Sequence, residues 1–492
     1  MKRCALILVL LTWASASFAV WPPAIRLTDG PNENINPDAY VQEQPTPTGP
    51  LVVVWQRSRL GGWDIYSREN RYGLSWRPPV IVSSLPDSNL TPTIAAYFNY
   101  KYCAWVNCHG DSQNILCSRM GRTDSTWGPA MYVTQDSFPN LEPSVWCSEY
   151  RDSAAVAWVS LRNGRWNLYT RFYNGTFWSP VIPLVTDSGN NRCPRFFRVN
   201  FVYTYLTWQS DVRGNWDIYT SRYSGGSWSA PQRITNGSQA DVQPSPVKGV
   251  NGGRDLVDLL WTSDSLGNWE VFGTSCSSIP LPTPERFTSH DSSDSEPSAL
   301  MYMLPSFGKA LYHPLLTAWT SRRDGNSNIY AENMNLTEVV DTNRAEDSHP
   351  TVSTTPGYKG KGNWIYNWVI WQSNRDGNWN LYGSYKMDWN GGVESGEAAS
   401  ASGSGSKFLS ACPFRPPGTI ALFLPESHSG LVLKLYDLQG RLLFERRPGS
   451  STPGKYEVRW DGRDDSGKSL SSGLYFLKPE GTSALFRIVL LR

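Results

Sequence analysis

Seven short segments of the chain each carry a variable residue directly before a proline. These residues are Asn36, Thr91, Glu142, Cys193, Gln243, Glu296 and His349. A proline fits the start of a strand because its missing N–H need not interrupt a hydrogen-bond ladder. We therefore expect seven strands that begin alike, with the residue before each proline at a common end.

If this position faces a shared channel, its polar members form a candidate ligand site. The candidate site consists of Glu142, Gln243, Glu296 and His349. Two carboxylates and an imidazole are groups that transfer protons in catalysis, for example in glycoside cleavage. The alternative is that these side chains cap strand starts or face water in the channel. No catalytic residue is assigned from the sequence alone.

Other common chemistries lack their sequence patterns in this chain. The five His residues are scattered and no Cys-x-x-Cys pair with a matching His occurs, so we expect no metal site. No GxSxG, HExxH or phosphate-binding loop is present, and no cofactor is expected.

The elements that would position the candidate site come from a long repeat. Seven copies of a hairpin pattern such as "WQSDVRGNWDIY" (208–219) follow the proline segments, with their first Trp residues 50–58 residues apart. The first Trp residues are Trp55, Trp105, Trp158, Trp208, Trp261, Trp319 and Trp371. This period in a chain rich in Trp, Tyr, Gly and Pro predicts an all-β, seven-bladed β-propeller. Its Trp, Asp, Gly and Asn residues are those of strands and tight turns, so the hairpin is interpreted as scaffold.

The ends of the repeat region predict how the ring closes. Residues 24–30, "AIRLTDG", resemble the outer-strand segment "QRITNG" at 232–237, while the seventh repeat has no clear outer strand of its own. The N-terminal segment is therefore expected to complete the last blade, which would remove the exposed edges.

One disulfide is predicted from turn geometry. If the second hairpin turns about residue 110, Cys103 falls opposite Cys117, close enough for a bridge. The alternative is a pair of buried thiols.

The first 19 residues have the layout of a secretory signal peptide. Lys2 and Arg3 precede an apolar run and a small-residue segment that ends at Ala19. Removing residues 1–19 takes away these two positive charges and lowers the formal net charge from +2 to 0. A balanced surface argues against nucleic acid as a partner. No later segment is apolar enough to span a membrane, so a secreted monomer with a repeat region over 20–389 is expected.

The composition changes after the repeats. Residues 390–407 are rich in Gly, Ser and Ala, which is typical of a flexible linker. Residues 408–492 alternate apolar segments with turn clusters and predict a small antiparallel β-sandwich. The segment "WDGRDDSGK" resembles a calcium loop, but its spacing favours an ordinary hairpin turn.

Two family resemblances follow from these residues. The hairpins, with a Ser, a polar turn, Gly, Trp or Asn and "IY", resemble the repeats of TolB-like, WD40-related propellers over about 22–389. The segments "PFRPPGTIALFLPE", "VLKLYDLQGRLL" and "YEVRWDGRDDSGKSLSSGLYFLK" resemble the C-terminal sorting domain of type IX secretion, which is similar to the immunoglobulin-like domain of the flagellar hook-capping protein. This resemblance implies a Gram-negative host, Sec export through the periplasm, and the type IX machinery as a partner of 408–492 at the outer-membrane surface.

These observations lead to two hypotheses of function. The favoured one is a secreted or cell-surface propeller without enzymatic activity that binds a protein or a glycan through exposed aromatic loops. The alternative is a secreted polysaccharide hydrolase or lyase with its site at the channel mouth. Convergence of Glu142, Glu296 and His349 on one pocket would favour the alternative.

Overall fold

The computed structural model divides the chain into two compact units, residues 1–393 and 394–492. It describes residues 21–41, 49–83, 85, 87–97, 99–148, 152–199, 203–249, 259–275, 283–301, 303–306, 309–312, 316–333, 336–356, 364–389, 407–408, 416–423, 431–437, 441–452, 455–470, 473–480 and 486–490. The predicted signal peptide (1–19) and, apart from residue 407, the predicted linker (390–407) lie outside the described residues.

The described residues form strands and turns and contain no helix, which confirms the predicted all-β class. None of them therefore belongs to a long apolar helix that could cross a bilayer.

The first four repeats each form one antiparallel sheet. The first contains β2 (Asn34–Val41), β3 (Leu51–Arg59), β4 (Gly62–Tyr72), β5 (Ser75–Trp76) and β6 (Val80–Ser83). The second contains β7 (Ser88–Tyr97), β8 (Tyr100–His109), β9 (Ser112–Gly121) and β10 (Met131–Tyr132). The third contains β11 (Asn140–Cys147), β12 (Ala154–Arg162), β13 (Arg165–Tyr173) and β14 (Ile182–Val185). The fourth contains β15 (Asn191–Val199), β16 (Tyr203–Ser210), β17 (Asp217–Ser224), β18 (Ser227–Trp228) and β19 (Gln232–Arg233).

The later repeats follow the same order, with two variations. The fifth contains β20 (Asp241–Gly249), β21 (Leu259–Ser263), β22 (Glu270–Thr274) and β23 (Glu285–Arg286). The sixth contains β24 (Asp294–Met301), β27 (Leu316–Ser321), β28 (Asn328–Asn333) and β29 (Leu336–Val339), with a separate hairpin of β25 (Met303–Ser306) and β26 (Lys309–Tyr312). The seventh contains β30 (Asp347–Pro356), β31 (Trp364–Ser373) and β32 (Asn380–Trp389). The ends of β20 and β24 pair in parallel and join the fifth and sixth sheets.

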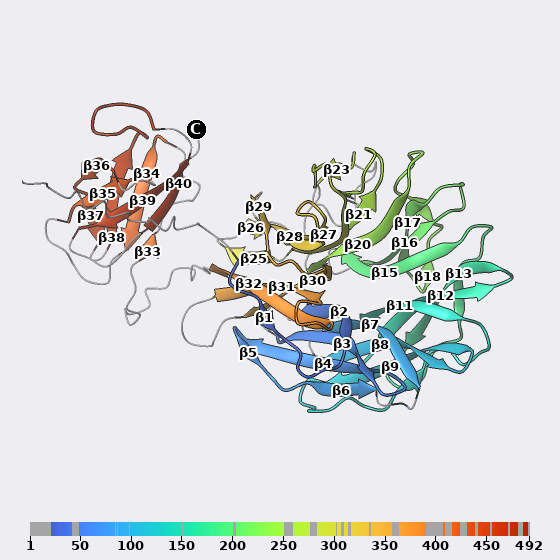
Figure 1. Cartoon of the computed structure of the whole chain (residues 1–492). Coiled ribbons are helices and arrows are strands. Elements are labelled where there is room, and N and C mark those ends of the chain that lie inside the picture. The colour runs from blue at the N-terminus through green and yellow to red at the C-terminus, as the bar shows by residue number, and fades with distance from the viewer. Residues whose placement is uncertain are drawn as a thin grey trace, which may run out of the picture. The chain divides into compact units, whose positions relative to one another are not determined.

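These sheets fan around a common centre, with β2, β7, β11, β15, β20 and β30 on the inside (Figure 1). The N-terminal unit is thus a β-propeller. Apolar clusters fill the spaces between successive sheets, for example around Trp105 between the first and second and around Trp208 between the third and fourth. Each sheet therefore buries both of its faces against neighbours.

The N-terminal segment completes the sheet of the seventh repeat. Strand β1 (Ile25–Arg26) pairs antiparallel with β32. Thr28 Oγ1 then accepts the backbone N–H of Leu381 at 3.0 Å, as Thr235 Oγ1 accepts that of Ile218 at 3.0 Å in the fourth repeat. The same residue type at the same place in the outer strand explains the likeness of the two segments in sequence.

The first Trp of each hairpin is buried. In the first and the third to sixth repeats it stacks on an aromatic residue of the next strand, as Trp208 does on Tyr219 with ring centroids 6.0 Å apart. In the first five repeats its indole N–H is donated to a side-chain oxygen at the start of the innermost strand, at 2.9–3.1 Å. The acceptors are Asn34, Asn89, Asn140, Asn191 and Asp241. In the sixth and seventh repeats the equivalent Asp294 and Asp347 bind Arg323 and Arg375 instead.

The predicted Cys103–Cys117 disulfide is wrong by one residue of register. The turn lies between His109 and Ser112, so Cys103 pairs with Ser118 and Cys117 pairs with Ala104. A shift of one residue moves a side chain to the other face of a sheet. Both residues are buried free thiols, with Cys103 packed toward the first repeat and Cys117 toward the third.

The C-terminal unit contains two four-stranded antiparallel sheets. One contains β33 (Lys407–Phe408), β34 (Gly418–Phe423), β37 (Gly449–Thr452) and β38 (Lys455–Trp460). The other contains β35 (Leu433–Tyr436), β36 (Leu442–Arg446), β39 (Gly473–Pro479) and β40 (Phe486–Leu490). Residues of both sheets form one core, in which Phe444 lies 5.2 Å from Trp460 between ring centroids. Asp464 accepts the backbone N–H groups of Ser466 and Lys468, so "DDSG" forms a hairpin turn.

Asp241→Asn should stabilise the N-terminal unit at neutral pH. Burial raises the pKa of the Asp241 carboxyl, so ionising it costs the folded state more than the unfolded chain. Stability is thus lost as pH rises through the folded pKa. An Asn keeps the acceptor for Trp261, as four other repeats do, and should raise stability at pH 7 by about 1 kcal/mol, with the gain vanishing near pH 4.

The measurement is thermal unfolding of both proteins across this pH range. Asp217→Asn is the matched control, and it should destabilise because it removes the buried carboxylate that binds Arg233 at 2.6 Å. A loss of stability in Asp241→Asn at pH 7 would contradict the argument.

Candidate functional site

Every innermost strand contains a β-bulge at the residue before the proline. In the first repeat Ile35 pairs with Gln56 and Asp38 with Val54, so Asn36 and Pro37 together oppose Trp55. The same shift occurs in the other six repeats. The residues before the prolines all adopt the left-handed conformation with φ of 48–56°. A bulge leaves the backbone N–H of this residue without a partner in its own sheet.

In three repeats the residue after the first Trp is Gln, and its side chain reaches the next repeat. Gln56, Gln209 and Gln372 each accept the backbone N–H of the bulge residue that follows, at 2.7–2.8 Å. The donors are Thr91, Gln243 and Asn36 respectively. These hydrogen bonds fasten one sheet to the next around the centre.

In the third, fifth and sixth repeats, which lack that Gln, the side chain of the bulge residue itself accepts the N–H of the next bulge residue. Glu142 Oε2 accepts the N–H of Cys193 at 2.6 Å, and Gln243 Oε1 accepts that of Glu296 at 3.1 Å. Glu296 Oε2 accepts the N–H of His349 at 2.8 Å. Three of the four residues of the candidate site therefore hold the propeller together.

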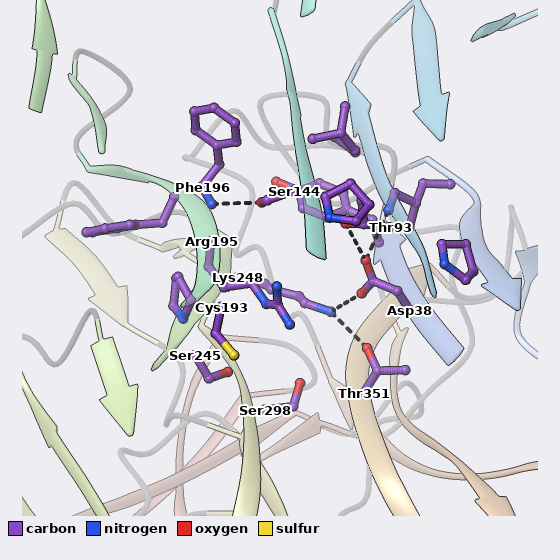
Figure 2. Close-up of a pocket in the computed structure, with 18 of the residues that line it drawn as sticks. Asp38, Thr93, Ser144, Cys193, Arg195, Phe196, Ser245, Lys248, Ser298 and Thr351 are labelled. Atoms are coloured by element: carbon purple, nitrogen blue, oxygen red, sulfur yellow. Dashed lines mark hydrogen bonds and ion pairs between the residues drawn. The ribbon is translucent and has the colours of Figure 1, made fainter. Parts of the chain in front are cut away.

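All four nevertheless line one cavity of about 490 Å³ on the propeller axis, together with the other three bulge residues. The structure thus brings Glu142, Gln243, Glu296 and His349 to one opening rather than to separate surface turns. The residues that follow the prolines line the same cavity, and several of them are labelled in Figure 2.

Glu142 is bound from two sides. Its Oε1 accepts from Arg192 Nε at 2.8 Å and its Oε2 accepts the N–H of Cys193. Burial, and to a lesser extent the carboxylate of Glu142, raise the pKa of the Cys193 thiol to about 11. Cys193 is therefore a neutral thiol at pH 7, which argues against a thiolate nucleophile.

His349 differs from the other three residues of the candidate site because its side chain does not accept a backbone N–H from the next repeat. In its repeat Gln372 fulfils that role, and the imidazole is exposed at the cavity. Glu296 Oε1 lies 3.4 Å from His349 Nδ1, while Glu296 Oε2 also accepts from Thr320 Oγ1 at 2.8 Å. A fixed carboxylate thus lies beside an exposed imidazole, the arrangement that orients a general base.

Lys248 crosses the cavity from β20 to the first and seventh repeats. Its Nζ donates to the Ala39 carbonyl at 2.7 Å and to Thr351 Oγ1 at 2.8 Å, and it lies 3.2 Å from Asp38 Oδ1 (Figure 2). The first three repeats carry Val41, Ala96 and Cys147 at the matching strand position. The fourth and seventh repeats carry Arg198 and Thr354 there, so the position varies in character and a single Lys is only a weak sequence signal.

The described residues contain no group of three or more His, Cys, Asp or Glu side chains arranged to hold a metal ion.

Comparisons with known proteins match each unit separately. Residues 415–484 match the FlgD Ig-like domain family, which confirms the immunoglobulin-like class of the C-terminal unit. No curated protein sequence matches the chain.

Among solved structures, an ulvan lyase of polysaccharide lyase family PL25 covers 74% of this chain and 95% of its own, with 9% identity and a TM-score of 0.44. An endo-arabinase from Bacteroides thetaiotaomicron covers 53% and 95%, with 12% identity and a TM-score of 0.30. A Bombyx mori GH32 β-fructofuranosidase covers 75% and 90%, with 10% identity and a TM-score of 0.33. At these identities the likeness concerns the fold alone.

The comparisons correct the favoured hypothesis of function. A propeller without enzymatic activity was expected, but the similar propellers include glycoside hydrolases and a polysaccharide lyase. These similar structures contradict the non-enzymatic hypothesis. The sequence favoured that hypothesis because it lacks the common catalytic motifs and because the four candidate residues could equally cap strand starts or face water.

Lys248→Met should destabilise the N-terminal unit. The substitution keeps the length of the side chain but removes three polar contacts that link strands more than 100 residues apart in sequence. We expect a loss of about 1–3 kcal/mol in thermal or denaturant unfolding. Lys248→Arg, which keeps the charge, should lose less. Equal stability of Lys248→Met and the parent chain would show that the bridge contributes nothing.

Proposed function

We propose that the N-terminal unit is a polysaccharide-processing enzyme, a hydrolase or a lyase, with its site at the axial cavity. His349 transfers the proton and Glu296 positions its imidazole. The observation that carries this proposal is the exposed His349 ring at the cavity, 3.4 Å from a carboxylate that is itself fixed by Thr320.

The same group serves both reaction types. In hydrolysis His349 accepts a proton from water as the water oxygen bonds to the anomeric carbon. The glycosidic C–O bond breaks, the leaving oxygen takes a proton from a solvent water, and the His349 imidazolium returns its proton to the resulting hydroxide. In elimination His349 accepts the proton from the carbon beside a uronate carboxylate, and the glycosidic C–O bond breaks on the neighbouring carbon. Glu142 is assigned no proton transfer, because Arg192 and the Cys193 N–H occupy both of its oxygens. Gln243 remains a candidate for binding sugar hydroxyls.

His349→Asn should abolish activity without loss of the fold. Asn36 occupies the equivalent bulge position in the first repeat, and Asn tolerates the left-handed conformation. Glu296→Gln should keep the fastening, as Gln243 does in the fifth repeat, but lower kcat by roughly 10–100-fold because the carboxylate beside His349 is lost.

The measurement is a reducing-end assay combined with absorbance at 235 nm for unsaturated sugars, with the melting temperature taken in parallel. Glu296→Ala is the control, since it should lower both activity and melting temperature. Full activity of His349→Asn on a cleaved polysaccharide would refute the assignment of His349.

We also propose that the repeats make seven blades of a closed propeller of the TolB-like, WD40-related type, spanning 20–389. Each repeat supplies an innermost strand with the same bulge, and β1 completes the sheet of the seventh. In each repeat that carries a Gln after the first Trp, or a Gln or Glu at the bulge, a side-chain oxygen accepts the bulge N–H of the next repeat. One of these hydrogen bonds joins the seventh repeat to the first.

For the C-terminal unit we propose the role of a type IX secretion sorting domain. The support is the sequence resemblance of 408–492 together with the FlgD-like match. With residues 1–19 as a signal peptide, the route is Sec export to the periplasm and then passage to the outer-membrane surface or the medium.

Deletion of 408–492 should retain the protein in the periplasm of a Gram-negative host that has type IX secretion. Cell fractionation and immunoblotting measure the location. The intact chain expressed in a strain without the translocon is the control and should be retained in the same way. Surface display of the truncated chain would contradict the proposal.

A further inference from the structure

A second ring of contacts lies one residue deeper than the bulge prolines. The residues that follow the prolines are Asp38, Thr93, Ser144, Arg195, Ser245, Ser298 and Thr351. Several accept a backbone N–H from the next repeat: Asp38 from Ile94 at 3.0 Å, Ser144 from Phe196 at 3.0 Å, Ser298 from Val352 at 3.1 Å and Thr351 from Ala39 at 3.2 Å. A side-chain oxygen at this position therefore has a structural role.

Arg195 is the exception, since it has no acceptor atom in its side chain. The next repeat offers a reason, because the residue that would donate is Pro246, which has no N–H. The fourth repeat thus needs no acceptor at this position. In the same repeat Gln209 accepts the bulge N–H of Gln243 in the fifth repeat, so this contact does not need Arg195 either.

The guanidinium of Arg195 extends into the cavity beside Lys248 (Figure 2). Its one hydrogen bond within the described part of the chain joins Nη1 to the carbonyl of the adjacent Pro194 at 3.0 Å. No carboxylate of the described residues forms an ion pair with it. Lys248, by contrast, has Asp38 as a partner at 3.2 Å.

We infer that Arg195 binds an anionic group of the substrate, and hence that the substrate is an acidic polysaccharide. This inference rests on the proposed function. A guanidinium offers parallel N–H donors that match the two oxygens of a carboxylate or a sulfate. The cavity of about 490 Å³ is within the range of small-molecule sites. Uronate carboxylates and sulfate esters share this chemistry.

Two observations exclude a scaffold role for Arg195. The side chain is exposed to the cavity although most other members of the ring are at least half-buried, and it has no protein partner except its neighbour's carbonyl. An unpaired cation beside a second cation raises the energy of the empty site, since like charges repel. An anion that enters the cavity relieves this repulsion.

Arg195→Ser tests the inference with a residue that three other repeats carry at this position. The probes are polygalacturonate as a uronate, dextran sulfate as a sulfated glucan, and arabinan as a neutral polymer, measured by affinity electrophoresis and calorimetry on residues 20–492. We expect the parent chain to bind at least one of the two acidic polymers and to bind arabinan only weakly. Arg195→Ser should lose 10-fold or more in affinity for the acidic polymer that the parent binds. Binding should also weaken with added salt.

Arg322→Ser is the matched control, because it removes the same charge from an exposed hairpin turn outside the cavity. It should bind within two-fold of the parent. The melting temperature of Arg195→Ser should equal or exceed that of the parent, whereas a scaffold residue would lower it.

The outcomes separate the two proposals. Arg195-dependent binding of either acidic polymer supports the inference even if no polymer is cleaved, in which case the proposed enzyme fails alone. Cleavage of a neutral polymer that depends on His349 but not on Arg195 overturns the inference and keeps the enzyme. Equal binding of acidic polymers by Arg195→Ser and the parent also overturns it.

Discussion

The N-terminal unit depends on one backbone constraint, the unpaired N–H at the bulge of each innermost strand. The bulge sets two residues against a single Trp, so the N–H of the first has no partner within its own sheet. A buried N–H without a partner costs about 1–3 kcal/mol, so the neighbouring repeat must supply an acceptor. That requirement turns separate sheets into a ring, because each bond joins one repeat to the next.

The same constraint distributes chemistry around the axis. In repeats with Gln after the first Trp, the Gln side chain accepts the bulge N–H of the following repeat. The side chain of their own bulge residue is therefore available for other roles. Asn36, Cys193 and His349 are in this group, and among them His349 has an ionisable side chain exposed at the cavity. Glu142, Gln243 and Glu296 occupy repeats without that Gln and serve the scaffold first. In Glu296 the two roles coincide, because one oxygen fastens the chain and the other faces the imidazole.

Charge in the cavity follows a similar logic. Most charged groups there are paired, Glu142 with Arg192 and Asp38 with Lys248. Arg195 is the exception. A residue other than proline at position 246 would have a backbone N–H that needs an acceptor, but Pro246 has none. Because Pro246 has no N–H to donate, the position of Arg195 needs no acceptor, and its side chain can contact a ligand instead.

The sequence by itself determined the all-β class, the repeat, the segment that resembles an outer strand and the immunoglobulin-like tail. These features depend on local signals, such as Trp spacing, turn residues and strand alternation, which act within a few residues of each other. It also identified the positions before the prolines as a set. The register of Cys103 and Cys117 was missed because a one-residue change in a turn leaves the pattern almost unaltered while it reverses the face. Only the tertiary structure decided which side chains meet at the axis. Lys248 and Asp38 are 210 residues apart in sequence, and the fastening bonds join residues of different repeats, so ring closure is what brings them together.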